Sequence, residues 1–264
     1  MKDSAIEWTH HTMNPWYGCT RVSPGCQHCY AETLMDTRYH KVEWGPGRKR
    51  QRTTVDYWKQ PLRWDRAAAA AGERHRVFCA SLADVFDPEV PAEWRADLYR
   101  LIRATPNLDW LLLTKRPEVA FDWTHLMGEY QNIWLGTSVE DTRRALERIP
   151  ILLSTPAVVR FLSIEPLLGP IGASLRGIDW VIVGGESGPG ARPMEPIWVE
   201  GIRDYCVANQ IPFHFKQWGG VNKKAAGREL GGRTWDELPT PRQIPTFHLS
   251  PEETAAARGF WRQP

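Results

Sequence analysis

The sequence has no long hydrophobic run, no large excess of charge and no even set of cysteines. No stretch approaches the roughly 20 consecutive apolar residues that a membrane-spanning helix needs. The first residues, MKDSAIEWTHHTMN, lack the apolar core and the small-residue cleavage site of a secretory signal peptide. These absences predict a cytoplasmic protein without a membrane anchor.

The net charge is small for a chain of this length. Lysine plus arginine number 33 and aspartate plus glutamate number 31, which gives a formal charge of +2 over 264 residues. A nucleic-acid partner would therefore have to be recognised locally and not by the charge of the whole molecule. The basic segment GRKRQR, residues 47–52, could follow a nucleic-acid backbone, or it could be an ordinary solvated loop.

The five cysteines do not suggest a disulfide framework, because three of them lie within eleven residues. In the segment WYGCTRVSPGCQHCYAE, six residues separate Cys19 from Cys26 and two separate Cys26 from Cys29. Three thiolates from one loop can bind three corners of a [4Fe–4S] cluster, and the missing fourth cysteine would leave one iron open to another ligand. Cys79 and Cys206 fall in a predicted strand and a predicted helix, and we expect both to be packed thiols.

The same spacing permits a second interpretation. Two of the cysteines form a Cys-x-x-Cys pair, and with the third cysteine and a nearby histidine they could bind one zinc ion tetrahedrally. The candidate histidines are His10, His11, His28 and His40. In that case the protein would be a zinc-stabilised module that recruits a partner or nucleic acid without chemistry.

Six short apolar runs alternate with helical segments along most of the chain. The runs are nearly continuous in hydrophobicity, as in strands buried on both faces of a parallel sheet. They cover residues 77–82, 109–115, 132–139, 158–166, 179–187 and 211–219. Helices are predicted at 30–40, 91–104, 141–149 and 196–209, and a first strand is predicted within 7–17.

This alternation predicts an α/β fold, and specifically a partial TIM barrel of the (β/α)6 type with six or seven βα units. We expect the barrel to occupy residues 1–219, with an insertion loop at 41–65 that is rich in glycine, proline and mixed charge. Residues 220–264 are predicted to form an irregular C-terminal extension that wraps the barrel or contacts a partner.

Polar residues follow the predicted strands at the end where barrels of this kind carry their catalytic groups. Among these residues, carboxylates and lysines suit catalysis, and hydroxyls and carboxylates suit cofactor binding. We assign catalytic roles to Lys115, Glu140 and Glu165, and cofactor-binding roles to Ser81, Thr114, Ser138 and Glu186. Each of them could instead form a salt bridge or a helix cap at the barrel rim.

A glycine pair stands beside one of these carboxylates. Gly184 and Gly185, in the segment VIVGGESG, would let a cofactor approach the backbone closely because they carry no side chain. The spacing of these glycines matches neither a dinucleotide-binding fingerprint nor a phosphate-binding loop. We therefore place both glycines in the cofactor-binding set.

Taken together, the motifs resemble a known family. NPWYGCTRVSPGCQHCYAE, LLTKRP, GTSVE, FLSIEPLLG and WVIVGGESGPGARPM are similar to segments of a phage- and prophage-associated three-cysteine-motif family of radical S-adenosylmethionine enzymes. The resemblance implies a [4Fe–4S] cluster on Cys19, Cys26 and Cys29, bound S-adenosylmethionine and an external electron donor. It also implies reductive cleavage of S-adenosylmethionine to a 5′-deoxyadenosyl radical.

One spacing departs from the commoner pattern of radical S-adenosylmethionine enzymes, which has three residues and not six between the first two cysteines. A longer loop still permits chelation, because the cost of closing a loop rises slowly with its length. In the common pattern the residue before the third cysteine contacts the adenine. The resemblance therefore places His28 in the cofactor-binding set.

The substrate is predicted from weaker signals. The basic loop, the fourteen tryptophans and the phage setting of similar proteins suggest modification or repair of a nucleic-acid-related substrate. A third hypothesis is a radical maturase that acts on a peptide, with a dedicated partner protein. The sequence leaves these possibilities open.

Overall fold

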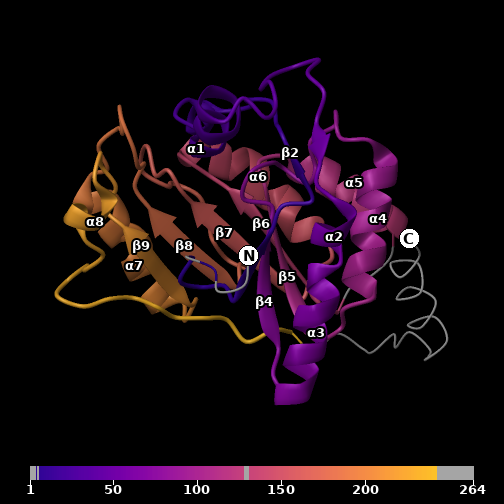
Figure 1. The fold of residues 1–264 in the computed structure, drawn as a ribbon. Coiled ribbons are helices and arrows are strands. Elements are labelled where there is room, and N and C mark those ends of the chain that lie inside the picture. Colours follow the sequence, from indigo (N-terminus) through magenta and orange to yellow (C-terminus); the bar gives the residue numbers. More distant parts are fainter. Residues whose placement is uncertain (1–3, 5, 128–130, 243–264) are drawn as a thin grey trace.

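A curled parallel sheet forms the centre of the computed structural model, which describes residues 4, 6–127 and 131–242 (Figure 1). Seven strands pair in the order β1, β4, β5, β6, β7, β8 and β9, and every neighbouring pair is parallel. The strands are His11–Met13, His75–Cys79, Leu108–Thr114, Ile133–Ser138, Val159–Ile164, Trp180–Gly184 and Phe213–Gln217. The strands lie in the sheet in the same order as in the sequence, as in a TIM-type barrel that does not close.

The predicted α/β class and the parallel sheet are confirmed, and the seven strands agree with the six or seven βα units that were expected. Each of the six predicted apolar runs overlaps a strand. The seventh strand, β1, lies within the predicted first strand at 7–17. The remainder of that segment includes β2 (Trp16–Tyr17), which pairs antiparallel with β3 (Gln51–Arg52) in a separate small sheet.

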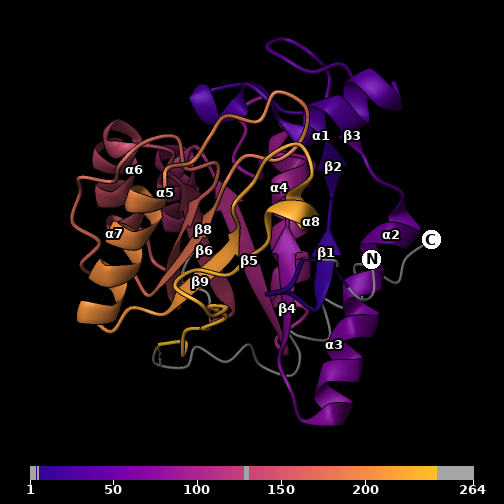
Figure 2. The ribbon, with the colours of Figure 1, turned by 90° about the vertical axis from the view of Figure 1, so that its left-hand side faces the viewer.

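Helices connect successive strands and pack on one face of the sheet (Figures 1 and 2). The larger ones are α3 (Gln60–Ala71), α4 (Ala92–Arg103), α5 (Pro117–Met127), α6 (Thr142–Ser154) and α7 (Pro196–Ala208). The short ones are α1 (Tyr30–Glu32), which continues as a π-helical segment at Thr33–Arg38, α2 (Val55–Trp58) and α8 (Lys223–Ala226). Within the described ranges, no helix has both the length and the apolar character needed to cross a membrane.

Several helices differ from the sequence-based expectation, since none was predicted at α2, α3, α5 or α8 and α6 extends beyond the predicted 141–149. Helix α3 begins inside the segment 41–65 that was predicted to be a loop, and it buries Trp64 and Ala68 before ending at Gly72, whose φ is 66°. Its alanine run hides the amphipathic pattern, because buried and exposed positions carry the same side chain. Helix α6 continues through Pro150, where a helix would usually end.

Side chains of the strands alternate between two apolar clusters, as expected from the pleat. One cluster joins the sheet to the helices and includes Leu98, Ile149 and Val199 from three of them. The other cluster contains no described helix residue and lies on the opposite, concave face; it includes Trp8, Phe78, Leu111, Trp134, Phe161, Trp180 and Ile182. Aromatic packing thus fills much of the concave face, and polar residues occupy the carboxyl ends of the strands.

The described part of the predicted extension lies along β9, one edge of the sheet. The Phe215 amide donates to the Trp235 carbonyl at 2.9 Å, and the Glu237 amide donates to the Phe213 carbonyl at 3.3 Å. The Trp235 ring packs edge-on against Phe213, with ring centroids 5.6 Å apart. Residues 243–264 of the predicted extension lie outside the described residues.

Candidate functional site

The loop between β2 and α1, which carries the three clustered cysteines, lies over the carboxyl ends of the parallel strands (Figure 1). Cys19 follows β2, and Cys29 is the residue immediately before α1. All three are free thiols that are neither fully buried nor fully exposed. Cys79 and Cys206 are completely buried in the apolar core between sheet and helices, so they are not available to the same ligand.

The spacing of the sulfur atoms distinguishes two kinds of metal site. A single zinc ion binds thiolates at about 2.3 Å, which brings tetrahedrally arranged sulfurs to within ~4 Å of one another. Among the described residues, the group of metal-binding side chains whose ligand atoms all lie within 4.8 Å of one another is Glu7, His214 and Asp236, and the three thiols do not form such a group. A cubane cluster accommodates wider spacing, because each thiolate binds a different iron atom.

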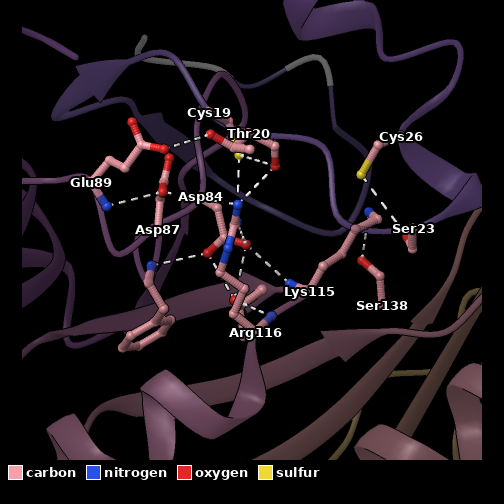
Figure 3. Close-up of polar contacts among 12 residues, drawn as sticks. Cys19, Thr20, Ser23, Cys26, Asp84, Asp87, Glu89, Lys115, Arg116 and Ser138 are labelled. Atoms are coloured by element: carbon pink, nitrogen blue, oxygen red, sulfur yellow. Dashed lines mark hydrogen bonds and ion pairs between the residues drawn. The ribbon is translucent and has the colours of Figure 1, made fainter. Parts of the chain in front are cut away.

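The first cysteine is held by a buried arginine at the end of β5 (Figure 3). Arg116 Nη1 lies 3.5 Å from Cys19 Sγ and 3.0 Å from Asp84 Oδ2, and Arg116 Nη2 donates to the Thr20 carbonyl at 2.7 Å. Asp84 also accepts a hydrogen bond from the Thr114 hydroxyl at 2.8 Å. The ends of β4 and β5 therefore fix the beginning of the cysteine loop.

The middle of the loop is held by Glu140, which follows β6 and is completely buried. Its Oε1 accepts from the Ser23 hydroxyl at 2.6 Å, and its Oε2 accepts from Arg148 of helix α6 at 3.1 Å. Gly25 packs closely on the same carboxylate, since a Cβ at Gly25 would lie 2.4 Å from Glu140 Oε1. One carboxylate thus joins the sheet, a helix and the residues beside Cys26.

The last part of the loop is held by Glu186, which follows β8. Glu186 Oε2 accepts hydrogen bonds from His28 Nδ1 at 2.9 Å and from Arg192 Nε at 2.8 Å. Arg192 Nη2 also donates to the Pro24 carbonyl at 3.0 Å. Burial would raise the pKa of Glu186, but the hydrogen bonds from Arg192 and His28 prevail and lower this pKa to about 2.

We expect Glu186→Gln to lower the free energy of unfolding in a pH-dependent way. The folded pKa of Glu186 is depressed to about 2, whereas a glutamate in an unfolded chain titrates near about 4.3. The ion pairs therefore stabilise the fold fully above the unfolded pKa, and this contribution is lost as the pH falls towards the folded pKa. Urea unfolding of the apoprotein should show a large difference between wild type and variant at pH 7 and a smaller one at pH 3. A difference that grows on acidification would contradict this assignment.

The thiols themselves have perturbed acidity. Burial raises the pKa of Cys19 to about 12, Asp84 adds to the rise and Arg116 opposes it. Burial also raises the pKa of Cys29, and the backbone N–H groups of Glu32 and Ala31 oppose this rise. Both thiols are therefore protonated at neutral pH in the metal-free protein, and metal binding would release their protons.

The predicted site residues divide into two groups in the structure. Glu140 and Glu186 bind the cysteine loop directly, Glu186 through His28 of the loop itself, and Thr114 binds Asp84 beside the loop. The others lie around the carboxyl ends of the strands. There Lys115 Nζ donates to Ser138 Oγ at 3.1 Å (Figure 3), and Glu165 pairs with Lys216 at 2.6 Å.

The remaining predicted residues are positioned by backbone packing or by neighbouring side chains. Ser81 Oγ accepts from Asn14 Nδ2 at 3.1 Å. A Cβ at Gly184 would lie 3.3 Å from Glu165 Oε1, so this glycine leaves room beside the carboxylate. Gly185 instead meets backbone, because a Cβ there would lie 2.1 Å from the Trp218 carbonyl oxygen.

The basic loop is mostly neutralised by its own surroundings. Arg50 is buried and donates to Asp87 at 2.8 Å. Arg52 pairs with Asp97 at 2.7 Å, and its guanidinium lies 4.3 Å from the Trp58 ring centroid. Arg48 forms a further exposed ion pair. These arginines therefore form ion pairs within the protein, which could not be predicted from a run of basic residues in the sequence.

Sequence reasoning missed several partners of the cysteine loop. The site residues predicted from the sequence did not include Asp84, Arg116, Ser23, Arg148 or Arg192. Ser23 and Glu140 are 117 positions apart in the chain, so no local pattern connects them. Only the strand-end position of Asp84, Arg116 and Glu140 gave a usable signal.

Comparison with known sequences identifies the family. The chain matches the family described as "Protein of unknown function (DUF5131)" over residues 3–239. It belongs to the DUF5131 family. A search of the curated proteins found no match to this DUF5131 chain.

Among solved structures, the DUF5131 chain is similar to a double mutant of spore photoproduct lyase with bound AdoMet and dinucleoside spore photoproduct. The TM-score is 0.47 and the sequence identity is 13%. The match covers 70% of this chain and 58% of that chain, so the DUF5131 chain spans less than two thirds of the lyase.

Proposed function

We propose that this member of the DUF5131 family is a radical S-adenosylmethionine enzyme. The observation that carries the proposal is a loop with three thiols, held over the carboxyl ends of a parallel sheet, whose sulfurs do not all lie within 4.8 Å of one another. Cys79 and Cys206 are buried elsewhere, so a cluster on this loop would have one corner without a cysteine ligand. The zinc-module alternative requires closer sulfurs than the described residues provide.

The residues present suit a [4Fe–4S] cluster held by Cys19, Cys26 and Cys29. When bound, such a cluster supplies one electron that splits S-adenosylmethionine into methionine and a 5′-deoxyadenosyl radical. An external electron donor is required, because the chain's own residues supply no electron. The protein's contribution is to hold the loop rigidly and to orient the cofactor.

Groups at the carboxyl ends of the strands are suited to orienting the cofactor. Lys115 lies close enough to Cys29 to lower the pKa of that thiol, although burial is the larger influence and raises it. A lysine ammonium there would bind a carboxylate. Glu165, between Lys216 and the space left by Gly184, would bind an amine or a ribose hydroxyl. The aromatic cluster on the concave face would keep water away from the reacting groups.

The substrate remains a separate proposal. A nucleic-acid-related substrate rests on the family resemblance of the sequence, because the arginines of the basic loop are paired within the protein. A radical maturase acting on a peptide is the alternative. Mass spectrometry of nucleosides from cells with and without the gene would separate the two, since only the first predicts a changed base.

The reaction itself is tested by product analysis. Anaerobically reconstituted protein, reduced with dithionite and given S-adenosylmethionine, should yield 5′-deoxyadenosine and methionine by liquid chromatography and mass spectrometry. Cys206→Ala, which changes a thiol in helix α7, serves as the matched control and should retain the activity. Colourless protein with stoichiometric zinc would overturn the proposal. So would a cluster-loaded, reduced sample that forms no 5′-deoxyadenosine with candidate substrates present.

A further inference from the structure

A buried cation contacts one of the three proposed cluster ligands. Arg116 is 5% exposed, and its Nη1 lies 3.5 Å from Cys19 Sγ. In the described part of the chain, Cys26 has only the Ser23 hydroxyl, at 3.9 Å, as a hydrogen-bond partner for its sulfur. The three sulfurs are therefore not equivalent. Among the described residues, Cys19 has a charged donor within hydrogen-bond distance of its sulfur, whereas Lys115 acts on Cys29 only through its charge.

The guanidinium is fixed by its other contacts. Asp84 accepts from Nη1 at 3.0 Å and the Thr20 carbonyl accepts from Nη2 at 2.7 Å. The Arg116 amide donates to the Thr114 hydroxyl at 2.9 Å, and Asp87 lies 3.9 Å from Nη2. A lysine could not satisfy these partners together, because it lacks the planar fork of donors. The geometry holds one N–H group towards the sulfur.

The charges around Arg116 are balanced before the thiol ionises. Two buried aspartates, Asp84 and Asp87, face two buried arginines, Arg116 and Arg50. A thiolate at Cys19 adds one negative charge directly beside Arg116. Hydrogen bonds to cluster sulfurs and nearby positive charge stabilise the reduced cluster, and they act strongly where water is excluded.

We propose that Arg116 is a positioning residue that raises the reduction potential of the cluster by donating a hydrogen bond to the Cys19 sulfur. This inference rests on the cluster of the proposed function. It assigns the neighbouring side chains of the LLTKRP segment to different tasks. Lys115 bonds to Ser138 at the end of β6, whereas Arg116 sets the electronic environment of the first cysteine. An arginine that merely held the loop in place would not change the potential.

Redox titration monitored by electron paramagnetic resonance tests the proposal. We expect Arg116→Gln to shift the midpoint potential of the reconstituted cluster to a more negative value. A tenfold loss in the equilibrium constant for reduction, which we expect, corresponds to about 59 mV for one electron. Arg103→Gln, on an exposed position of α4, is the matched control and should leave the potential unchanged. An unchanged potential in fully loaded Arg116→Gln would overturn the proposal.

A second variant predicts a shift of opposite sign. Asp84→Asn removes the negative charge that competes for the guanidinium, so Arg116 should act more strongly on the sulfur and the potential should become more positive. If Arg116→Gln does not assemble a cluster, Asp84→Asn tests whether Arg116 raises the reduction potential. An unchanged or more negative potential in Asp84→Asn would then overturn the proposal.

The two proposals fail in different ways. Wild-type protein that assembles no cluster would refute the radical enzyme itself. Wild-type protein that assembles a cluster of the same potential as Arg116→Gln would refute only the role of Arg116. The titration needs no S-adenosylmethionine, so its result does not depend on turnover.

Discussion

Cys19→Ala, Cys26→Ala and Cys29→Ala should each abolish binding of the [4Fe–4S] cluster. Each thiolate would bind a different iron atom, so two remaining cysteines would leave two irons without a protein ligand. The expected result is colourless protein after anaerobic reconstitution, with iron and sulfide contents near zero. Formation of 5′-deoxyadenosine should fall below detection in all three variants.

The same variants should remain folded, because the loop is held by contacts that do not involve a metal. Arg116, Glu140 and Glu186 each bind a different part of the loop. The circular dichroism spectrum and the midpoint of thermal unfolding should therefore match those of the wild-type apoprotein. Cys206→Ala should retain the cluster. Full cluster occupancy in any variant of the three would contradict the ligand assignment.

Glu140→Gln should cost about 3 kcal/mol of folding free energy, measured by urea unfolding of the apoprotein. Glu140 is completely buried, and its partner Arg148 is nearly so. Removing one charge of a buried pair leaves the other uncompensated, which typically costs 3–5 kcal/mol. The variant should also assemble less cluster, because the amide has one acceptor oxygen in place of two and cannot accept from both Ser23, next to Cys26, and Arg148.

A matched control exists on the same helix. Glu147 of α6 pairs with Arg143 and Arg144 at the surface, and Glu147→Gln should change stability little because such pairs are screened by water. Unfolding of Glu140→Gln within about 0.5 kcal/mol of wild type would show that Glu140 does not hold the loop.

The sheet could be predicted from the sequence because its strands are buried on both faces. Nearly continuous apolar runs such as 179–187 admit few other structures, and each of the six overlaps a strand. Helix α3 could not be predicted in the same way, because its run of alanines carries no contrast between faces. Whether an element could be predicted therefore depended on the contrast in hydrophobicity between its side chains and not on its length.

The cysteine triad was visible in the sequence, but the partners that hold its loop were not. Strand-end position correctly brought Asp84, Glu140 and Glu186 to one end of the sheet. Strand-end position did not show in which direction these side chains point, because the regular alternation of side chains between the two faces of a sheet ends with the strand. Glu140 lies two residues beyond the end of β6, and its carboxylate accepts a hydrogen bond from Ser23 of the loop. Such choices depend on partners far away in the chain.

The pairing of residues 235–237 with β9 has a practical consequence. A chain shortened to Gly219 would contain every cysteine and every strand, yet it would expose the amide and carbonyl groups that Trp235 and Glu237 now satisfy. Bare edges of this kind invite pairing between molecules and lead to aggregation. Soluble shortened forms should therefore end beyond Glu237. Residues 235–237 cover the edge of the sheet and thereby oppose self-association.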